Sequence, residues 1–258
     1  MAPAWKEEYL DFVLVPGGLL VMVGYHLFHL HRCINRAETT VVGYENYNRR
    51  VWIARVLEIL QAEVKDRDQA LTVMGNYLSA AMSLASVALA LSSLIGAWIG
   101  SSYHGEFIAA RVYGNMSSTI VYIKYLSILS TFMVSFACFV HASTSFVHAS
   151  FLISLPNCVM PASNVESAVI TGSNSWVVGL RSLYLASNLM LWIFGPIPMF
   201  VSSVVMVALL QYLDRNTTPL PQYDRPMSYD SFKNIDDREE SEDSLNGTSS
   251  LLPTPVRA

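Results

Sequence analysis

The side chains of this 258-residue sequence that are best suited to chemistry are histidines near the ends of two apolar stretches. His26 and His29 are three positions apart, and His141 and His148 are seven apart, so each pair lies on one face of a helix. Neutral imidazole is a ligand of haem iron and of transition metals. If both helices end at the same membrane depth, the four imidazoles predict a bis-histidine haem or metal site. The interpretation that we favour has no cofactor, and the histidines contact lipid headgroups and loop carbonyls instead.

Other catalytic or metal-binding patterns are absent from the sequence. It has no phosphate-binding glycine loop, no His-Glu-x-x-His zinc motif and no paired carboxylates in an apolar stretch. Cys33, Cys138 and Cys158 are too scattered for a disulfide framework or a Cys-x-x-Cys metal site. We therefore expect a protein that is not an enzyme and does not bind nucleic acid. We also expect no acidic residue inside a membrane span, which argues against a proton-coupled pump.

The elements that must position these side chains are four apolar stretches. Only 14% of the residues are charged, compared with about 25% in soluble proteins. A helix needs about 20 mostly apolar residues to cross a bilayer. Four stretches without Lys, Arg, Asp or Glu are long enough: 12–31, 74–100, 125–165 and 182–213. The sequence therefore predicts an all-α protein, a four-helix transmembrane bundle over residues 1–213, with spans at about 10–31, 76–99, 122–147 and 190–212.

The fourth span contains a break at Gly195, Pro196 and Pro198, and Pro16 lies in the first span. Proline lacks a backbone donor and disfavours helix at the preceding residue. In one interpretation the helix is discontinuous at membrane depth, and its free carbonyls line a pathway for a small solute or ion. In the interpretation that we favour, Pro196 begins the helix proper, where proline is well tolerated.

Small residues recur in the second span at helical spacing, and Gly96 and Gly100 end that series in a Gly-x-x-x-Gly pattern. The full series comprises Ala80, Ala88, Ser92, Gly96 and Gly100. Such a face lets helix backbones approach closely in lipid. We expect it to pack inside the bundle, and the alternative is association with a second copy of the chain. Asn188 is a further predicted packing residue, because its amide can form a hydrogen bond between helices.

The distribution of basic residues predicts the orientation. Segments 32–73 and 148–181 carry more Lys and Arg than the other connections, which assigns them to the cytoplasm and both termini to the other side. In that topology Asn115 and Asn246 lie in glycosylation sequons on the non-cytoplasmic side. The tail sequence Tyr229-Asp230-Ser231-Phe232 disagrees, because it resembles a cytosolic sorting signal. We expect the plasma membrane or a secretory-pathway membrane.

Two further segments lie outside the predicted spans. Residues 48–66 have apolar side chains at helical spacing, which predicts a cytoplasmic amphipathic helix. This helix lies on the membrane surface or packs on the protein's own cytoplasmic face. Residues 214–258 are acidic and rich in Ser, Thr and Pro, so we expect a disordered tail.

Several runs of the sequence resemble a family of plant membrane proteins with bacterial relatives, catalogued as domain of unknown function 599. The runs are Tyr9-Leu10-Asp11 leading to Gly24-Tyr25-His26, then 42–52 (VGYENYNRRVW), 148–153 (HASFLI) and 191–200 (LWIFGPIPMF). The resemblance covers roughly residues 5–213 and implies a four-span membrane protein, without an established activity, ligand or partner. We therefore expect a non-enzymatic membrane protein that acts by association in the lipid bilayer; the solute pathway and the haem protein are the alternatives.

Overall fold

The computed structural model describes residues 7–60, 65–101, 118–155 and 162–219. These residues are almost entirely helical, as predicted. The elements are α1 (Glu7–Asn35), η1 (Ala37–Thr39), α2 (Val41–Leu60), α3 (Lys65–Ser101), α4 (Ser118–Ser154), α5 (Ala162–Leu191), η4 (Trp192–Phe194) and α6 (Pro196–Leu213).

Five of the described helices, not four, are long and apolar enough to cross a membrane. The additional candidate is 163–194, which the sequence analysis divided between a cytoplasmic loop and the start of the last span. The four-span prediction is therefore wrong. It failed because Arg181 interrupts the charge-free run of α5, and a buried, paired charge such as this one is compatible with a helix inside the bundle.

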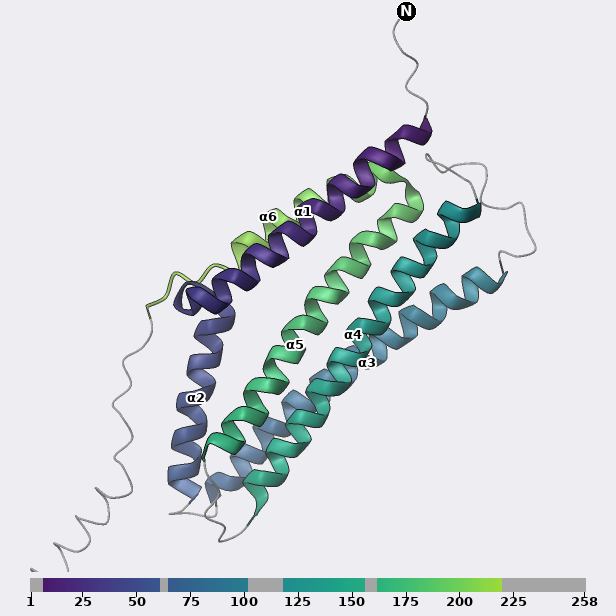
Figure 1. Ribbon diagram of the computed structural model, residues 1–258. Helices are drawn as coiled ribbons and strands as arrows, with labels where there is room; N and C mark the ends of the chain where they lie inside the picture. The colour runs from purple at the N-terminus through teal and green to yellow at the C-terminus, as the bar shows by residue number, and fades with distance from the viewer. Residues whose placement is uncertain (1–6, 61–64, 102–117, 156–161, 220–258) are drawn as a thin grey trace, which may run out of the picture.

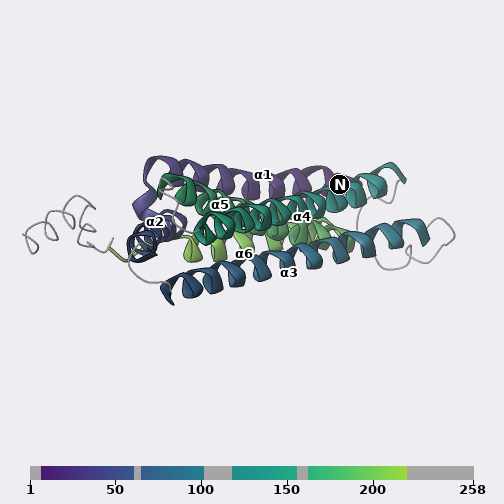
Figure 2. The ribbon, with the colours of Figure 1, turned by 90° about the horizontal axis from the view of Figure 1, so that it is seen from below.

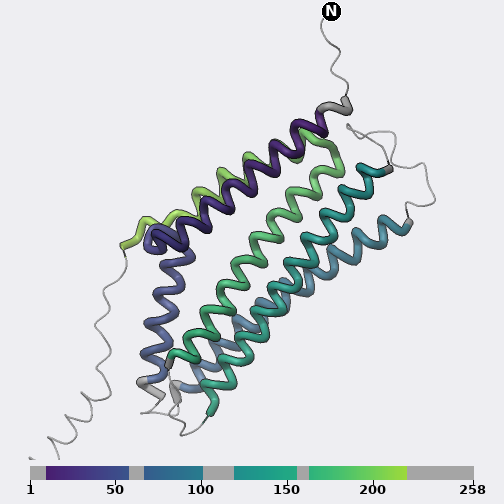
Figure 3. The backbone as a smooth tube through the Cα atoms, in the orientation of Figure 1, coloured from purple at the N-terminus to yellow at the C-terminus, as the bar shows by residue number. Residues whose placement is uncertain are grey.

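Three long helices, α3, α4 and α5, run side by side, and α1 and α6 form a parallel pair beside them (Figure 1). Viewed along the perpendicular direction, α1 and α3 lie on opposite sides of the molecule (Figure 2). The backbone trace shows α2 turning away from the end of α1 and following the lower part of α5 (Figure 3). Consequently α1 begins at one end of the bundle, and α6 ends at the other.

The break in the sequence is the turn between α5 and α6. Gly195 has φ 132°, a conformation that L side chains rarely adopt, and Pro196 is the first residue of α6. Pro198 belongs to the first turn of α6, and α1 continues through Pro16. The favoured interpretation of Pro196 as a helix start agrees with this geometry, although 190–194 belong to α5 and η4 rather than to the last span.

The packing face of α3 includes Ala88 and Ser92 of the predicted series, but not Ala80, Gly96 or Gly100. Its buried small residues include Ala81, Ala85, Ala88 and Ser92, whereas Gly96 and Gly100 are exposed, and a Cβ added to either would have open space for 4 Å around it. The expected internal packing of those two glycines is therefore wrong. Close approach occurs instead between α4 and α5, where a Cβ on Gly172 would lie 2.7 Å from Phe146, and one on Gly179 would lie 2.9 Å from Phe139.

The predicted amphipathic helix corresponds to much of α2, and it packs on the protein itself. Ile53 is buried in a cluster with residues of α3, α4 and α5, and Trp52, Val56 and Leu57 cover that cluster. Residues 61–64 of the predicted helix lie outside the described residues, as do Asn115, Asn246 and positions 220–258 of the tail.

Candidate binding site: a cavity beside a buried ion pair

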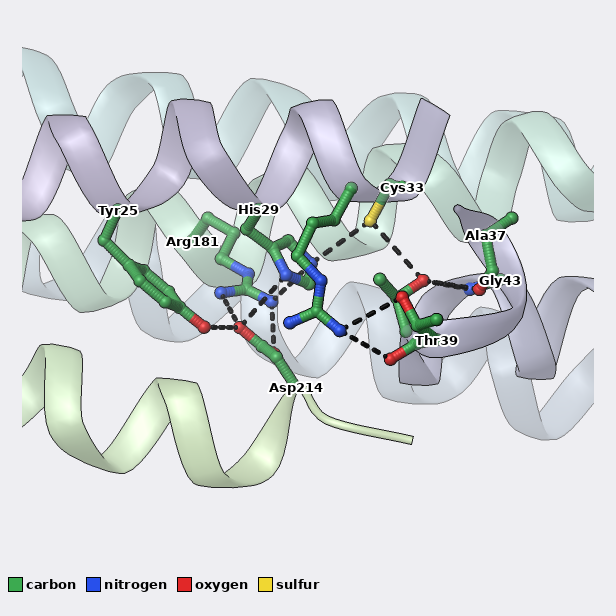
Figure 4. A network of polar contacts seen from close by, with 10 residues as sticks. Tyr25, His29, Cys33, Ala37, Thr39, Gly43, Arg181 and Asp214 are labelled. Atoms are coloured by element: carbon green, nitrogen blue, oxygen red, sulfur yellow. Dashed lines mark hydrogen bonds and ion pairs between the residues drawn. The ribbon is translucent and has the colours of Figure 1, made fainter. Parts of the chain in front are cut away.

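A buried ion pair joins α5 to the residue that follows α6. Arg181 Nη1 donates to Asp214 Oδ2 at 2.7 Å, and Nη2 donates to Oδ1, so the guanidinium holds the carboxylate at both oxygens. The two side chains are only 15% and 11% exposed. Tyr25 of α1 donates its hydroxyl to Asp214 Oδ2 at 2.6 Å. Three helices thus meet at one carboxylate (Figure 4).

This arrangement stabilises the ionised form of Asp214. Burial opposes the charge, but the hydrogen bonds from Arg181 and Tyr25 outweigh burial and hold the pKa of the Asp214 carboxyl below its ordinary value. A buried charge with excellent partners is tolerated, whereas the same charge without a partner is strongly destabilising. We conclude that the pair holds the position of α6 relative to α5 and α1.

His29 extends the network, and its partners indicate one tautomer. Its Nδ1 lies 3.5 Å from Asp214 Oδ2, a group that can only accept. Its Nε2 lies 3.3 Å from Arg181 Nη2, a group that can only donate. A neutral ring with the proton on Nδ1 satisfies both contacts.

The same network continues into the corner between α1 and α2. The Cys33 thiol, which has a single proton to donate, lies 3.3 Å from His29 Nε2 and 3.7 Å from Thr40 Oγ1. The Thr40 hydroxyl donates to the Ala37 carbonyl at 2.8 Å. A Cβ on Gly43 would lie 2.1 Å from Ala37 O, so this tight corner requires glycine. Residues after α6 pair with the corner through the Thr40–Arg215 bridge.

A cavity of about 810 Å³ lies among α1, α2 and α5, directly beside this network. Its volume falls in the range of small-molecule sites, about 300–1,000 Å³. Its walls combine apolar and polar side chains, including Leu30, Ile34, Val177 and Leu185 together with Arg50 and Arg181. Parts of two sequence runs that carry the family resemblance line this cavity, at His26 and at Asn46, Tyr47 and Arg50.

His26 lines the same cavity in a different state from His29. Both of its ring nitrogens are buried, and neither has a hydrogen-bond partner among the described residues. Its ring packs edge-on to Tyr25, with centroids 5.9 Å apart. Buried polar atoms without hydrogen bonds are unusual. This wall of the cavity therefore carries two ring nitrogens whose hydrogen bonds no described residue provides.

The four predicted ligand histidines are not brought together. His26 and His29 lie on α1, which packs mainly against α6, whereas His141 and His148 are exposed on α4, which packs against α3 and α5. Within the described residues, no group of three or more His, Cys, Asp or Glu side chains is placed to hold a metal. The haem alternative depended on the four histidines lying close together, and this arrangement is not present.

A second buried pair lies near the opposite end of the bundle. Lys124 Nζ of α4 lies 3.7 Å from Asp11 Oδ1 of α1, and Trp192 Nε1 donates to the same oxygen at 2.9 Å. Asp11 belongs to a candidate span, so the expectation that spans contain no acidic residue is wrong. Between the two pairs, Asn188 donates to Ser203 Oγ at 2.8 Å and joins α5 to α6.

Sequence reasoning missed the central residues of the site, Arg181 and Asp214. A signal was present, because Arg181 is the only charged residue between Glu166 and Asp214. A single charge in so long an apolar region predicts a buried partner rather than a loop.

Comparison with known proteins agrees with the resemblance seen in the sequence. No curated protein and no solved structure matches the chain significantly. Residues 13–219 match the family described as "Protein of unknown function, DUF599", a region that contains nearly all of the described bundle. The plant origin implied by the resemblance stays a prediction. The match covers most of the chain, and the protein therefore belongs to the DUF599 family.

Proposed function

We propose that this protein is a non-enzymatic integral membrane protein that binds an amphiphilic small molecule in the cavity among α1, α2 and α5. The observation that carries the proposal is the cavity itself, about 810 Å³, with apolar walls and converging polar groups. Binding sites for small molecules in helical membrane proteins commonly lie between helices in this way.

The polar groups beside the cavity favour binding over catalysis. Arg181 directs two of its nitrogens at Asp214, and His29 contacts both partners of that pair. Side chains that form hydrogen bonds with one another are suited to fixing the positions of the helices that form the cavity wall. These three side chains are therefore engaged with one another, and His26 is left as a polar group that a bound ligand can contact.

We also infer a topology in which α2 and the residues after α6 lie in the cytoplasm. An odd number of spans separates the start of α1 from the end of α6. The connections at the α2 end carry most of the Lys and Arg, including Arg36, Arg49, Arg50 and Arg55. This replaces the prediction that both termini are non-cytoplasmic, which depended on four spans. Glycosylation of Asn115 but not of Asn246 in microsomes would support the new topology, and the reverse pattern would refute it.

The solute-pathway alternative has less support. It requires an interrupted helix at membrane depth, whereas Gly195 lies at the turn between two complete helices, and α1 is continuous at Pro16. Association between copies through the exposed Gly96 and Gly100 stays a prediction; Gly96→Leu should reduce oligomers in mild detergent if that face is used.

The binding proposal is tested by filling the cavity. Val177→Trp adds a large side chain to the cavity wall, and Val205→Trp makes the same change at an exposed position of α6, 54% accessible, outside the cavity. We expect native mass spectrometry of protein released from nanodiscs to show a bound small molecule with the wild type and Val205→Trp, and none with Val177→Trp. Identical spectra for all three proteins would overturn the proposal.

A further inference from the structure

We propose that the occupant of this cavity is a glycerophospholipid of the leaflet on the α2 side, which enters sideways between α1 and α5. This inference rests on the proposed binding function and specifies its ligand. One acyl chain would lie along the apolar wall, and the phosphate would be recognised by Arg50 of α2.

The apolar mouth of the cavity indicates entry from the bilayer. Leu30 and Ile34 of α1 are 54% and 72% exposed, and Val178 of α5 is 51% exposed, and all three line the cavity. Both helices are candidate membrane spans, and in a bilayer such exposed apolar side chains would face hydrocarbon rather than water. The two helices also diverge, since α1 packs against α6, and α5 packs against α4 and α2 (Figure 1).

The other end of the cavity is polar and lies on α2, which is not among the candidate spans. There Asn46 Nδ2 donates to Asn174 Oδ1 at 3.0 Å and closes the gap between α2 and α5. Arg50 lines this end, and its Nε lies 3.2 Å from Glu166 Oε1. A chain bound along the apolar wall would therefore place its headgroup at the level of the membrane interface.

Arg50, not Arg181, is the guanidinium suited to the phosphate. Arg181 holds the Asp214 carboxylate at both oxygens, whereas Arg50, in the part of the chain that the structure describes, pairs with one oxygen of Glu166, a side chain that is 38% exposed. Guanidinium binds phosphate through parallel hydrogen bonds. Glu38 also lines the cavity, and its negative charge disfavours a lipid with a net negative charge. We therefore expect Arg50 to recognise the phosphate group itself and not the net charge of the lipid.

The experiment compares two lipids with the same acyl chains, one with a phosphocholine headgroup and one with a free hydroxyl in its place. Phosphatidylcholine and diacylglycerol, each with the same diazirine-bearing acyl chain, are added at low fraction to phosphatidylcholine nanodiscs that contain the full chain. After irradiation, peptide mass spectrometry locates the crosslinks. We expect labelling of 26–34 and 177–185, with phosphatidylcholine preferred about tenfold, the effect of one hydrogen bond to a charged group.

Two variants form a matched pair for the phosphate contact. Arg50→Gln removes the guanidinium, and Glu166→Gln breaks the same ion pair but leaves the guanidinium in place. We expect Arg50→Gln to abolish the lipid preference and Glu166→Gln to keep it. An equal loss in both variants would mean that the ion pair only holds α2 against α5, and it would overturn the role of Arg50.

The outcomes separate this inference from the proposed function. Equal labelling of the cavity by both lipids would refute phosphate recognition and leave the binding function standing. Competition by free glycerol 3-phosphate would identify a soluble anion as the ligand and refute the lipid. Absence of labelling at 26–34 and 177–185, together with identical native mass spectra for Val177→Trp and wild type, would refute both.

Discussion

Arg181 and Asp214, 33 positions apart in the sequence, hold the end of α6 against α5 through paired hydrogen bonds. Tyr25 and His29 bring α1 to the same carboxylate. The position of three helices beside the cavity therefore depends on one ion pair. Removal of this pair should destabilise the packing of α1, α5 and α6 at that end of the bundle.

Removing one member of this pair should destabilise the protein strongly. Arg181→Met leaves a buried carboxylate without its main partner, and the expected loss is about 3–5 kcal/mol in the free energy of unfolding. Thermal unfolding in detergent measures it. The matched control is Glu45→Gln, which breaks the pair between the exposed Glu45 and Arg49 and should cost less than about 1 kcal/mol. Similar losses in both variants would show that the Arg181 pair is no more important than an exposed ion pair.

The double variant Arg181→Met/Asp214→Leu should recover part of that loss. Both charges are then absent, so no buried charge lacks a partner. If the double variant unfolds as easily as Arg181→Met alone, packing of the arginine stem, and not its charge, explains the effect.

The Asp214 carboxyl should make stability depend on pH. Its pKa is lower in the folded protein than in the unfolded chain, so its contribution is complete above the ordinary aspartate value of about 4 and disappears as the pH falls through the folded value. Asp214→Asn lacks this contribution at every pH. We expect the difference in unfolding temperature between the wild type and Asp214→Asn to narrow on acidification, and a constant difference would contradict the assignment.

The glycines of α5 should matter more than those of α3. Gly179→Ala places a methyl group 2.9 Å from Phe139, which has no room to give way in a buried position, and the expected cost is about 1–3 kcal/mol. Gly96→Ala adds the same methyl group in open space. Its unfolding temperature in detergent should equal that of the wild type or exceed it, and a loss as large as that of Gly179→Ala would mean that the α3 glycines are covered.

Gly195→Ala should weaken the turn between α5 and α6. The residue has φ 132°, and a side chain there is expected to cost about 1–3 kcal/mol. Limited proteolysis at this turn, compared with wild type, provides the measurement. Unchanged cleavage and unchanged unfolding would show that the turn relaxes without strain.

Much of the fold could be predicted from the sequence, because apolar length alone identifies a membrane helix, and Pro196 marks a helix start. The fifth candidate span was missed because a charged residue such as Arg181 is typical of a loop. Its partner, Asp214, is 33 positions away in the sequence, and only the folded structure brings the two together. The histidines illustrate the same limit. Spacing places His26 and His29 on one face of α1, but it says nothing about which helix that face meets. Packing decides that α1 meets α6, and so the partners of His29 are Arg181 and Asp214 rather than His141 and His148.

The last described residues are fastened where α1 turns into α2. Asn216 donates its backbone N–H to Thr39 O at 3.1 Å and its side-chain amide to Glu38 O at 3.0 Å, next to the Thr40–Arg215 bridge. The chain therefore leaves the bundle from a fixed tether point on the rim of the cavity. Loss of the Asn216 contacts would therefore loosen the corner at Glu38, which lines the cavity, so a residue outside every candidate span helps to shape the site.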